Sequence, residues 1–149
     1  MLPVVLCFVC ELNSRKHQNI NTFVMTKMFF IVGMGSFIGG GMRYLTQQLV
    51  AKQFSAPFPY GTLIVNILGC FLIGIIFSLS EKANLLSTEM RLFLATGFCG
   101  GFTTFSTFSL ENYGMLRDGE YYYVFAYTGL SVFVGFLATY MGIQLIKAL

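Results

Sequence analysis

The sequence has little charge and no tryptophan, and its shortage of charge limits what the chain can be. Only 10% of its 149 residues are charged, and 56% are hydrophobic. Soluble domains usually carry about 25% charged residues. The basic residues are scattered, so they do not form the clustered patch that nucleic-acid binding requires. The composition therefore excludes a nucleic-acid partner and favours a chain whose outer surface faces lipid.

Residues that bind metals or carry out redox chemistry are also few. The single histidine, His17, has no partner histidine with which to form a metal site. Cys7 and Cys10 form a CxxC pair without a strand–helix context or a second pair, so we expect no redox or metal role for them. Cys70 and Cys99 lie in apolar runs, where a thiol packs as a small hydrophobe. Because no nucleophile–base pair or metal cluster is present, the sequence does not predict an enzyme.

Four stretches are long and apolar enough to cross a bilayer, which takes about 20 residues of helix. They are Met28 to Ala51, Gly61 to Ser80, Leu92 to Leu110 and Tyr121 to Ile146. Short polar connections join them, one containing Pro57 and Pro59 and another containing Ser87, which predicts a helix start. The sequence therefore predicts an all-α integral membrane protein with one four-helix domain over residues 28–149 and both termini on one side.

Residues 1–27 do not fit this scheme. The apolar stretch from Met1 to Cys10 is too short to span a bilayer. It also lacks the basic region and the cleavage site of a secretory signal. We expect this segment to be either a disordered extension or an upstream start-site artefact, with the true start at Met25 or Met28.

The charges of the connections give little preference for one orientation. Three basic residues fall on the side of the termini and two on the other, and Lys27 would raise the first count to four. They are Lys82, Arg91 and Lys147 on the first side, and Lys52 and Arg117 on the second. Because such a weak bias lets a chain insert both ways, two oppositely inserted copies could form an antiparallel homodimer.

The third span carries the strongest signal. From Gly97 to Ser109 it reads GFCGGFTTFSTFS. Each glycine costs about 1 kcal/mol of helix stability relative to alanine, and Ser and Thr side chains compete for backbone hydrogen bonds. We therefore expect the helix to break near Gly100 and Gly101. A break at membrane depth survives only if it is buried in protein or lines a wet cavity, and its freed carbonyls could hold a hard cation. The alternative is a kinked helix that packs dry.

Two pairs of polar residues lie four apart in other spans, so that each pair shares a helix face. Thr62 and Asn66 form one pair, and Tyr127 and Ser131 form the other. The Asn66 amide offers two N–H donors, and the hydroxyls of the second pair offer more. Either these groups bond between helices, or they line a pore.

Aromatic and small residues accompany these donors. Phe105 and Phe108 are three apart on one face, and a ring has a positive edge that can favour an anion. Gly35 and Gly39 could let helices approach closely. Arg43 in the first span could reach the interface or present a cation at an anion vestibule.

The intramembrane groups are therefore rich in hydrogen-bond donors and poor in carboxylates. The four spans contain no acid, and Glu111 lies at the end of the third, whereas a cation pathway would have rings of Asp or Glu. The pattern suits a small, strongly hydrated anion whose water shell is replaced by fixed donors. Passive conduction is favoured over coupled transport.

Three motifs together resemble those of the CrcB/Fluc fluoride channels. They are GGFTTFSTF at 100–108 followed by Glu111, GTLIVN at 61–66, and a glycine-rich first span that ends in Arg43-Tyr44. The likeness covers residues 28–149. It implies a fluoride-selective channel that exports fluoride passively across the cell inner membrane and acts as a dual-topology antiparallel homodimer.

The resemblance also implies roles for particular residues. A structural Na⁺ at the dimer centre would be held by main-chain carbonyls of Gly100 and Thr103. Asn66 would be the pore amide, with Phe105 and Phe108 as the rings that contact the ion. The polar track beside them would consist of Thr62, Thr107, Tyr127 and Ser131, with Gly135 leaving its far end undefined. The main alternative is a small dual-topology multidrug exporter, which would need a Glu in the first span; a non-transporting membrane subunit is another.

Overall fold

The computed structural model describes residues 22–54, 58–82 and 85–149, with side chains from Val24 onward. Cys7, Cys10, His17 and Pro57 lie outside the described residues, as do residues 1–21 of the predicted N-terminal extension. Every regular element in the described part is helical, and no strand occurs there. The all-α prediction is confirmed.

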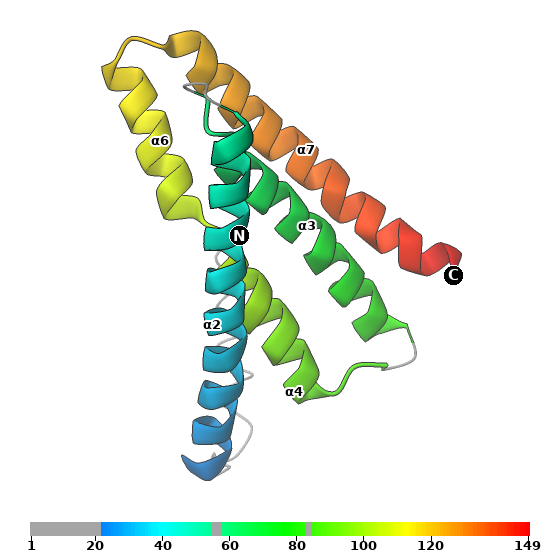
Figure 1. Ribbon diagram of the computed structural model, residues 1–149. Coiled ribbons are helices and arrows are strands. Elements are labelled where there is room, and N and C mark those ends of the chain that lie inside the picture. Colours follow the sequence, from blue (N-terminus) through cyan, green and yellow to red (C-terminus); the bar gives the residue numbers. More distant parts are fainter. Residues whose placement is uncertain (1–21, 55–57, 83–84) are drawn as a thin grey trace, which may run out of the picture.

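Three helices are long and apolar enough to cross a membrane. They are α2 (Thr22–Gln53), α3 (Tyr60–Glu81) and α7 (Tyr121–Ala148) (Figure 1). Their ends fall within two residues of the predicted spans, except that α2 begins six residues before Met28. The first helix thus includes the last part of the segment that we expected to lie outside the domain. The chain is a multi-pass membrane protein.

The third predicted span is interrupted. It consists of α4 (Thr88–Arg91), the π-helical η1 (Leu92–Cys99), α5 (Gly100–Phe102) and α6 (Phe105–Arg117). Its start is as predicted, because the Ser87 hydroxyl accepts a hydrogen bond of 3.2 Å from the Met90 backbone N–H. The break falls at Thr103 and Thr104, whose backbones are extended. The expected break is therefore present, but it lies just beyond the two glycines.

Packing and capping explain this position. A Cβ on Gly101 would lie 2.5 Å from the Ser36 backbone oxygen, so this glycine allows a close helix crossing within regular helix. Three residues later, the Thr104 hydroxyl accepts from the Thr107 backbone N–H at 3.3 Å. Threonine is a good N-cap. The chain therefore leaves the helix where Thr104 can begin α6.

Glycines bring the other helices together. A Cβ on Gly35 or Gly39 would meet the backbone of η1, and at Gly39 it would collide with the Phe98 carbonyl oxygen. On the other side, Gly74 of α3 faces the backbone of α7, and Gly142 of α7 faces the backbone of α3. The interpretation of Gly35 and Gly39 as helix-packing residues is confirmed.

The helices alternate in direction (Figure 1). The start of α3 and the α6–α7 turn lie at one end, together with the end of α2, while the end of α3 and the starts of α4 and α2 lie toward the other. Large apolar side chains cover the outside; Phe37 and Phe136 are 84% and 74% exposed. Such a surface is costly in water and favourable in lipid.

Candidate functional site

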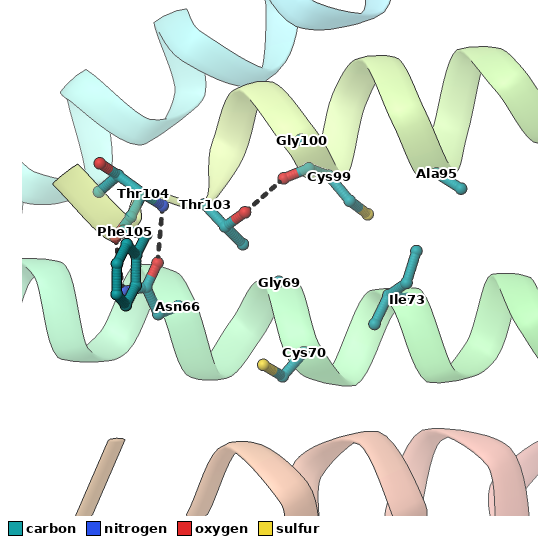
Figure 2. Close-up of a pocket in the computed structure, with 10 residues that line it drawn as sticks. All are labelled: Asn66, Gly69, Cys70, Ile73, Ala95, Cys99, Gly100, Thr103, Thr104 and Phe105. Carbon is teal, nitrogen blue, oxygen red and sulfur yellow. Dashed lines mark hydrogen bonds between the residues drawn. The ribbon is translucent and has the colours of Figure 1, made fainter. Parts of the chain in front are cut away.

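Asn66 closes the break in the third segment with two hydrogen bonds. Its Nδ2 donates to the Thr104 carbonyl oxygen at 3.1 Å, and its Oδ1 accepts from the Thr104 backbone N–H at 2.8 Å (Figure 2). The side-chain amide thus replaces the backbone partners that Thr104 would have in a continuous helix. Only one of its two N–H donors is used among the described residues. The second N–H is available to a ligand.

The break also releases backbone carbonyls. In an unbroken helix the Thr104 N–H would bond to Gly100, but here it donates to Asn66. The Gly100 carbonyl thereby loses its helical donor, and Gly100 is exposed. The Thr103 carbonyl accepts from Arg43 Nη1 at 3.2 Å. Arg43 therefore lies at the break, beside the carbonyls that the sequence analysis expected to hold sodium; its expected role as a vestibule cation stays a prediction.

A pocket of about 410 Å³ opens beside the break. Figure 2 shows its lining, which combines α3 with the two halves of the interrupted segment. Its polar lining consists of Asn66, Thr103 and Thr104, and Phe105 also lines it. The Phe105 ring is 79% exposed. The pocket thus brings together the predicted pore amide, one predicted ring and both predicted carbonyl-bearing residues.

A second polar cluster lies around Glu111. Thr62 Oγ1 donates to Glu111 Oε1 at 2.7 Å, and the Tyr127 hydroxyl donates to Glu111 Oε2 at 2.7 Å. Gln47 Nε2 donates to Thr62 Oγ1 at 3.1 Å. Thr62 and Tyr127 are buried. The cluster joins α2, α3, α6 and α7, so each of the four long helical segments contributes one side chain.

This cluster changes the interpretation of Thr62 and Tyr127, which the sequence analysis predicted to be pore donors. A hydroxyl can donate only one hydrogen bond. The hydroxyls of Thr62 and Tyr127 both donate theirs to Glu111. Sequence reasoning assigned no role to Glu111 or Gln47. The available signal for Glu111 was its position directly after the apolar third span, next to the GGFTTFSTF motif. Its partners lie far away in sequence, and no local pattern identifies them.

A row of rings connects the pocket to the Glu111 cluster. The ring centroids of Phe105 and Phe108 are 5.8 Å apart. Phe108 in turn packs on Tyr127 at 4.9 Å. The predicted pairing of Phe105 and Phe108 on one face is therefore present. The rings thus run from Phe105, which lines the pocket with Asn66, to Tyr127, whose side chain is fully buried at the cluster.

The two remaining track residues differ in their bonding. Thr107 accepts a hydrogen bond from Thr104 Oγ1 at 3.0 Å, which places it in the cap of α6. The Ser131 hydroxyl is buried and has no partner among the described residues. Gly135, one turn further along α7, is also buried and faces Cys70. Ser131 is thus the one predicted track residue in the described part with an unpaired buried oxygen.

The fold and the site together define a class of protein. This is a multi-pass helical membrane protein with a discontinuous helix, whose freed backbone groups lie beside a largely apolar pocket that Asn66 also lines. Discontinuous membrane helices occur where backbone lines a protein-covered site or a wet cavity.

Sequence comparison identifies the family within this class. The family described as CrcB-like protein, Camphor Resistance (CrcB), matches residues 30–143. The chain is 43% identical to a fluoride-specific ion channel FluC of Flavobacterium psychrophilum over 123 residues, which cover 83% of this chain and 99% of the relative. It is 50% identical to a protein of the same name from Chlorobium phaeobacteroides (strain BS1) over 117 residues, covering 78% and 91%.

A third relative of that name, from Clostridium perfringens, is 54% identical over 90 residues, which cover 60% of this chain and 70% of the relative. The matched residues include α3, the interrupted segment and most of α7. The chain belongs to the CrcB-like family.

Proposed function

We propose that this chain is a fluoride-selective channel that lets fluoride leave the cell passively across the inner membrane, and that it is not an enzyme. The names of its relatives support this function. The observation that carries it is the ring row of Phe105, Phe108 and Tyr127, which joins the free amide donor of Asn66 to the hydroxyl donors around Glu111. In this row the edges of the Phe105 and Phe108 rings would face an anion held by the free N–H of Asn66.

The dehydration of fluoride determines how many hydrogen-bond donors the path must provide. Fluoride entering a narrow passage loses water, and each lost hydrogen bond needs a fixed donor in its place. The second N–H of Asn66 is one such donor, and the unpaired hydroxyl of Ser131 is another. Thr62 and Tyr127 can donate to the ion only when their hydrogen bonds to Glu111 are broken. Glu111 thus competes with the anion for two of the track's donors.

We further propose that the interrupted segment is the fourth membrane span and that the protein is an antiparallel, dual-topology homodimer. In a single chain the pocket at the break is open, so Arg43 and the freed backbone groups would face lipid. Unpaired backbone in lipid costs several kcal/mol for each group. A second, inverted copy would cover the break, and the weak charge bias of the connections allows that insertion.

The dimer centre would hold a structural Na⁺ through main-chain carbonyls. The residues fit this ion, because Gly100 has lost its helical donor and is exposed, while a carbonyl oxygen with two lone pairs lets Thr103 serve Arg43 as well. Carbonyl oxygens freed by broken membrane helices are suited to sodium. The ion would supply positive charge that offsets the converging carbonyl dipoles.

A small multidrug exporter is not supported. An exporter of that kind depends on a carboxylate in its first span, and α2 contains none between Thr22 and Gln53. The carboxylate of Glu111 lies instead on α6, with both oxygens engaged.

The proposal is tested by ion efflux from liposomes that contain the purified protein. We expect rapid efflux of fluoride, followed with a fluoride electrode, and very little efflux of chloride from matched vesicles. Protein-free liposomes serve as the control for leakage. Equal efflux of both ions would refute the proposed selectivity. The absence of any fluoride efflux would refute the proposed function.

A further inference from the structure

Gln47 is the one member of the Glu111 cluster that has no place in the proposed path. It lies on α2, is half-buried, and donates from Nε2 to Thr62 Oγ1 at 3.1 Å. Thr62 donates in turn to Glu111, on α6. Gln47 is therefore the outer end of a chain of hydrogen bonds that leads to the carboxylate.

The direction of these bonds follows from the chemistry of the groups. An ionised carboxylate only accepts, so Thr62 must give its single proton to Glu111. The Thr62 oxygen can then only accept from Gln47, which requires the nitrogen of the amide to face it. Successive hydrogen bonds of one direction also polarise each other, which makes the middle hydroxyl a stronger donor.

We infer that Gln47 is a positioning residue that keeps the Thr62 hydroxyl donating to Glu111 and thereby holds this carboxylate against Tyr127 at the end of the ring row; this inference rests on the proposed fluoride conduction. When the amide donor is lost, the buried oxygen of Thr62 must find another donor, and the hydroxyl of Tyr127 is close by on the same carboxylate. Glu111 would then lose a partner, and the donors would no longer point the same way.

The backbone supports this contact. Gly61 precedes Thr62, and a Cβ at this position would lie 3.4 to 3.5 Å from Cα, Cβ and Cγ of Gln47. These are ordinary packing distances, and they show that the Gln47 side chain lies along the start of α3, next to the hydroxyl that it contacts.

The test compares two neighbouring glutamines in the full-length protein reconstituted in liposomes. Gln47→Met keeps the length of the side chain and removes the donor. Gln48→Met makes the same change at an exposed position. We expect Gln47→Met to lower the maximal fluoride flux about fivefold to tenfold, which corresponds to one lost hydrogen bond. Gln48→Met should keep the flux of the unmodified protein.

A pH profile separates positioning from a general loss of structure. In Gln47→Glu the introduced carboxyl group is an acceptor when ionised, but it can donate to Thr62 when protonated. Its flux should therefore rise toward that of the unmodified protein as the pH falls, within the range where protein-free vesicles retain fluoride. The titratable groups joined to it through Thr62 are Glu111 and, on the same carboxylate, Tyr127, and Arg43 lies one turn earlier on α2. The profile of the unmodified protein records their contribution.

Three results would overturn the inference. They are an unchanged flux in Gln47→Met, an equal loss in Gln48→Met, and a pH profile of Gln47→Glu that parallels the unmodified protein. If Gln47→Met does not fold, the pH profile still decides. If the unmodified protein passes no fluoride, the proposed function itself fails, which is a different result from a Gln47 variant that conducts normally.

Discussion

The Asn66→Asp substitution tests the role of the break most sharply. The carboxylate can still accept from the Thr104 N–H, but it cannot donate to the Thr104 carbonyl, which lies 3.1 Å from Nδ2. One lost hydrogen bond and one unpaired carbonyl cost about 1–3 kcal/mol of stability, so we expect the protein to fold. The second consequence concerns the ion. Two negative charges about 4 Å apart repel by roughly 4 kcal/mol at an effective dielectric constant of about 20.

At about 1.4 kcal/mol for each factor of ten, this repulsion should lower fluoride flux by roughly two to three orders of magnitude. The control is Asn112→Asp, because Asn112 also donates to a backbone carbonyl, that of Phe108, at 2.9 Å and accepts from Thr128. Fluoride efflux is measured for both variants, with size-exclusion chromatography to check assembly. A normal flux in Asn66→Asp, or an equal loss in Asn112→Asp, would refute the reasoning.

Three further substitutions follow from the same contacts. Phe108→Ile should nearly stop fluoride efflux while leaving assembly intact, because it removes the ring between the pocket and the cluster; undiminished flux would exclude the ring from the path. Glu111→Gln should lower thermal stability in detergent by roughly 1–3 kcal/mol, since an amide N–H₂ would face a hydroxyl donor, and an unchanged melting temperature would contradict the hydrogen-bond assignment. Gly39→Ala should cost about 1–3 kcal/mol because its Cβ meets the Phe98 carbonyl, whereas Gly40→Ala, which meets nothing within 4 Å, should be neutral; equal melting temperatures would argue against the close α2–η1 crossing.

The sequence predicts the helices well because length and apolar composition are local properties. The span Gly61 to Ser80 became α3 at Tyr60–Glu81, and Ser87 is the expected cap. The packing role of Gly35 and Gly39 was also predictable from the sequence, because small residues four apart are a known helix-packing motif.

Interactions that cross the chain could not be predicted in this way. The break was expected at Gly100 and Gly101 but lies at Thr103 and Thr104. Gly101 stays in regular helix because it allows a close helix crossing. Asn66, 38 residues from Thr104, supplies the hydrogen bonds that the break leaves unmade. Hydropathy showed Glu111 only as a residue near a span end. Its hydrogen bonds from Thr62 and Tyr127 depend on the packing of α3, α6 and α7. No local spacing in the sequence predicts that packing. The dual-topology dimer and the sodium ion stay predictions.

A structure of the assembled protein in lipid, determined with fluoride present, tests the central claim most directly. The account predicts two inverted copies with fluoride density beside the Asn66 amide and the edges of the Phe105 and Phe108 rings. Copies that leave Phe105 facing lipid, with no passage that joins Asn66 to Tyr127, would contradict it.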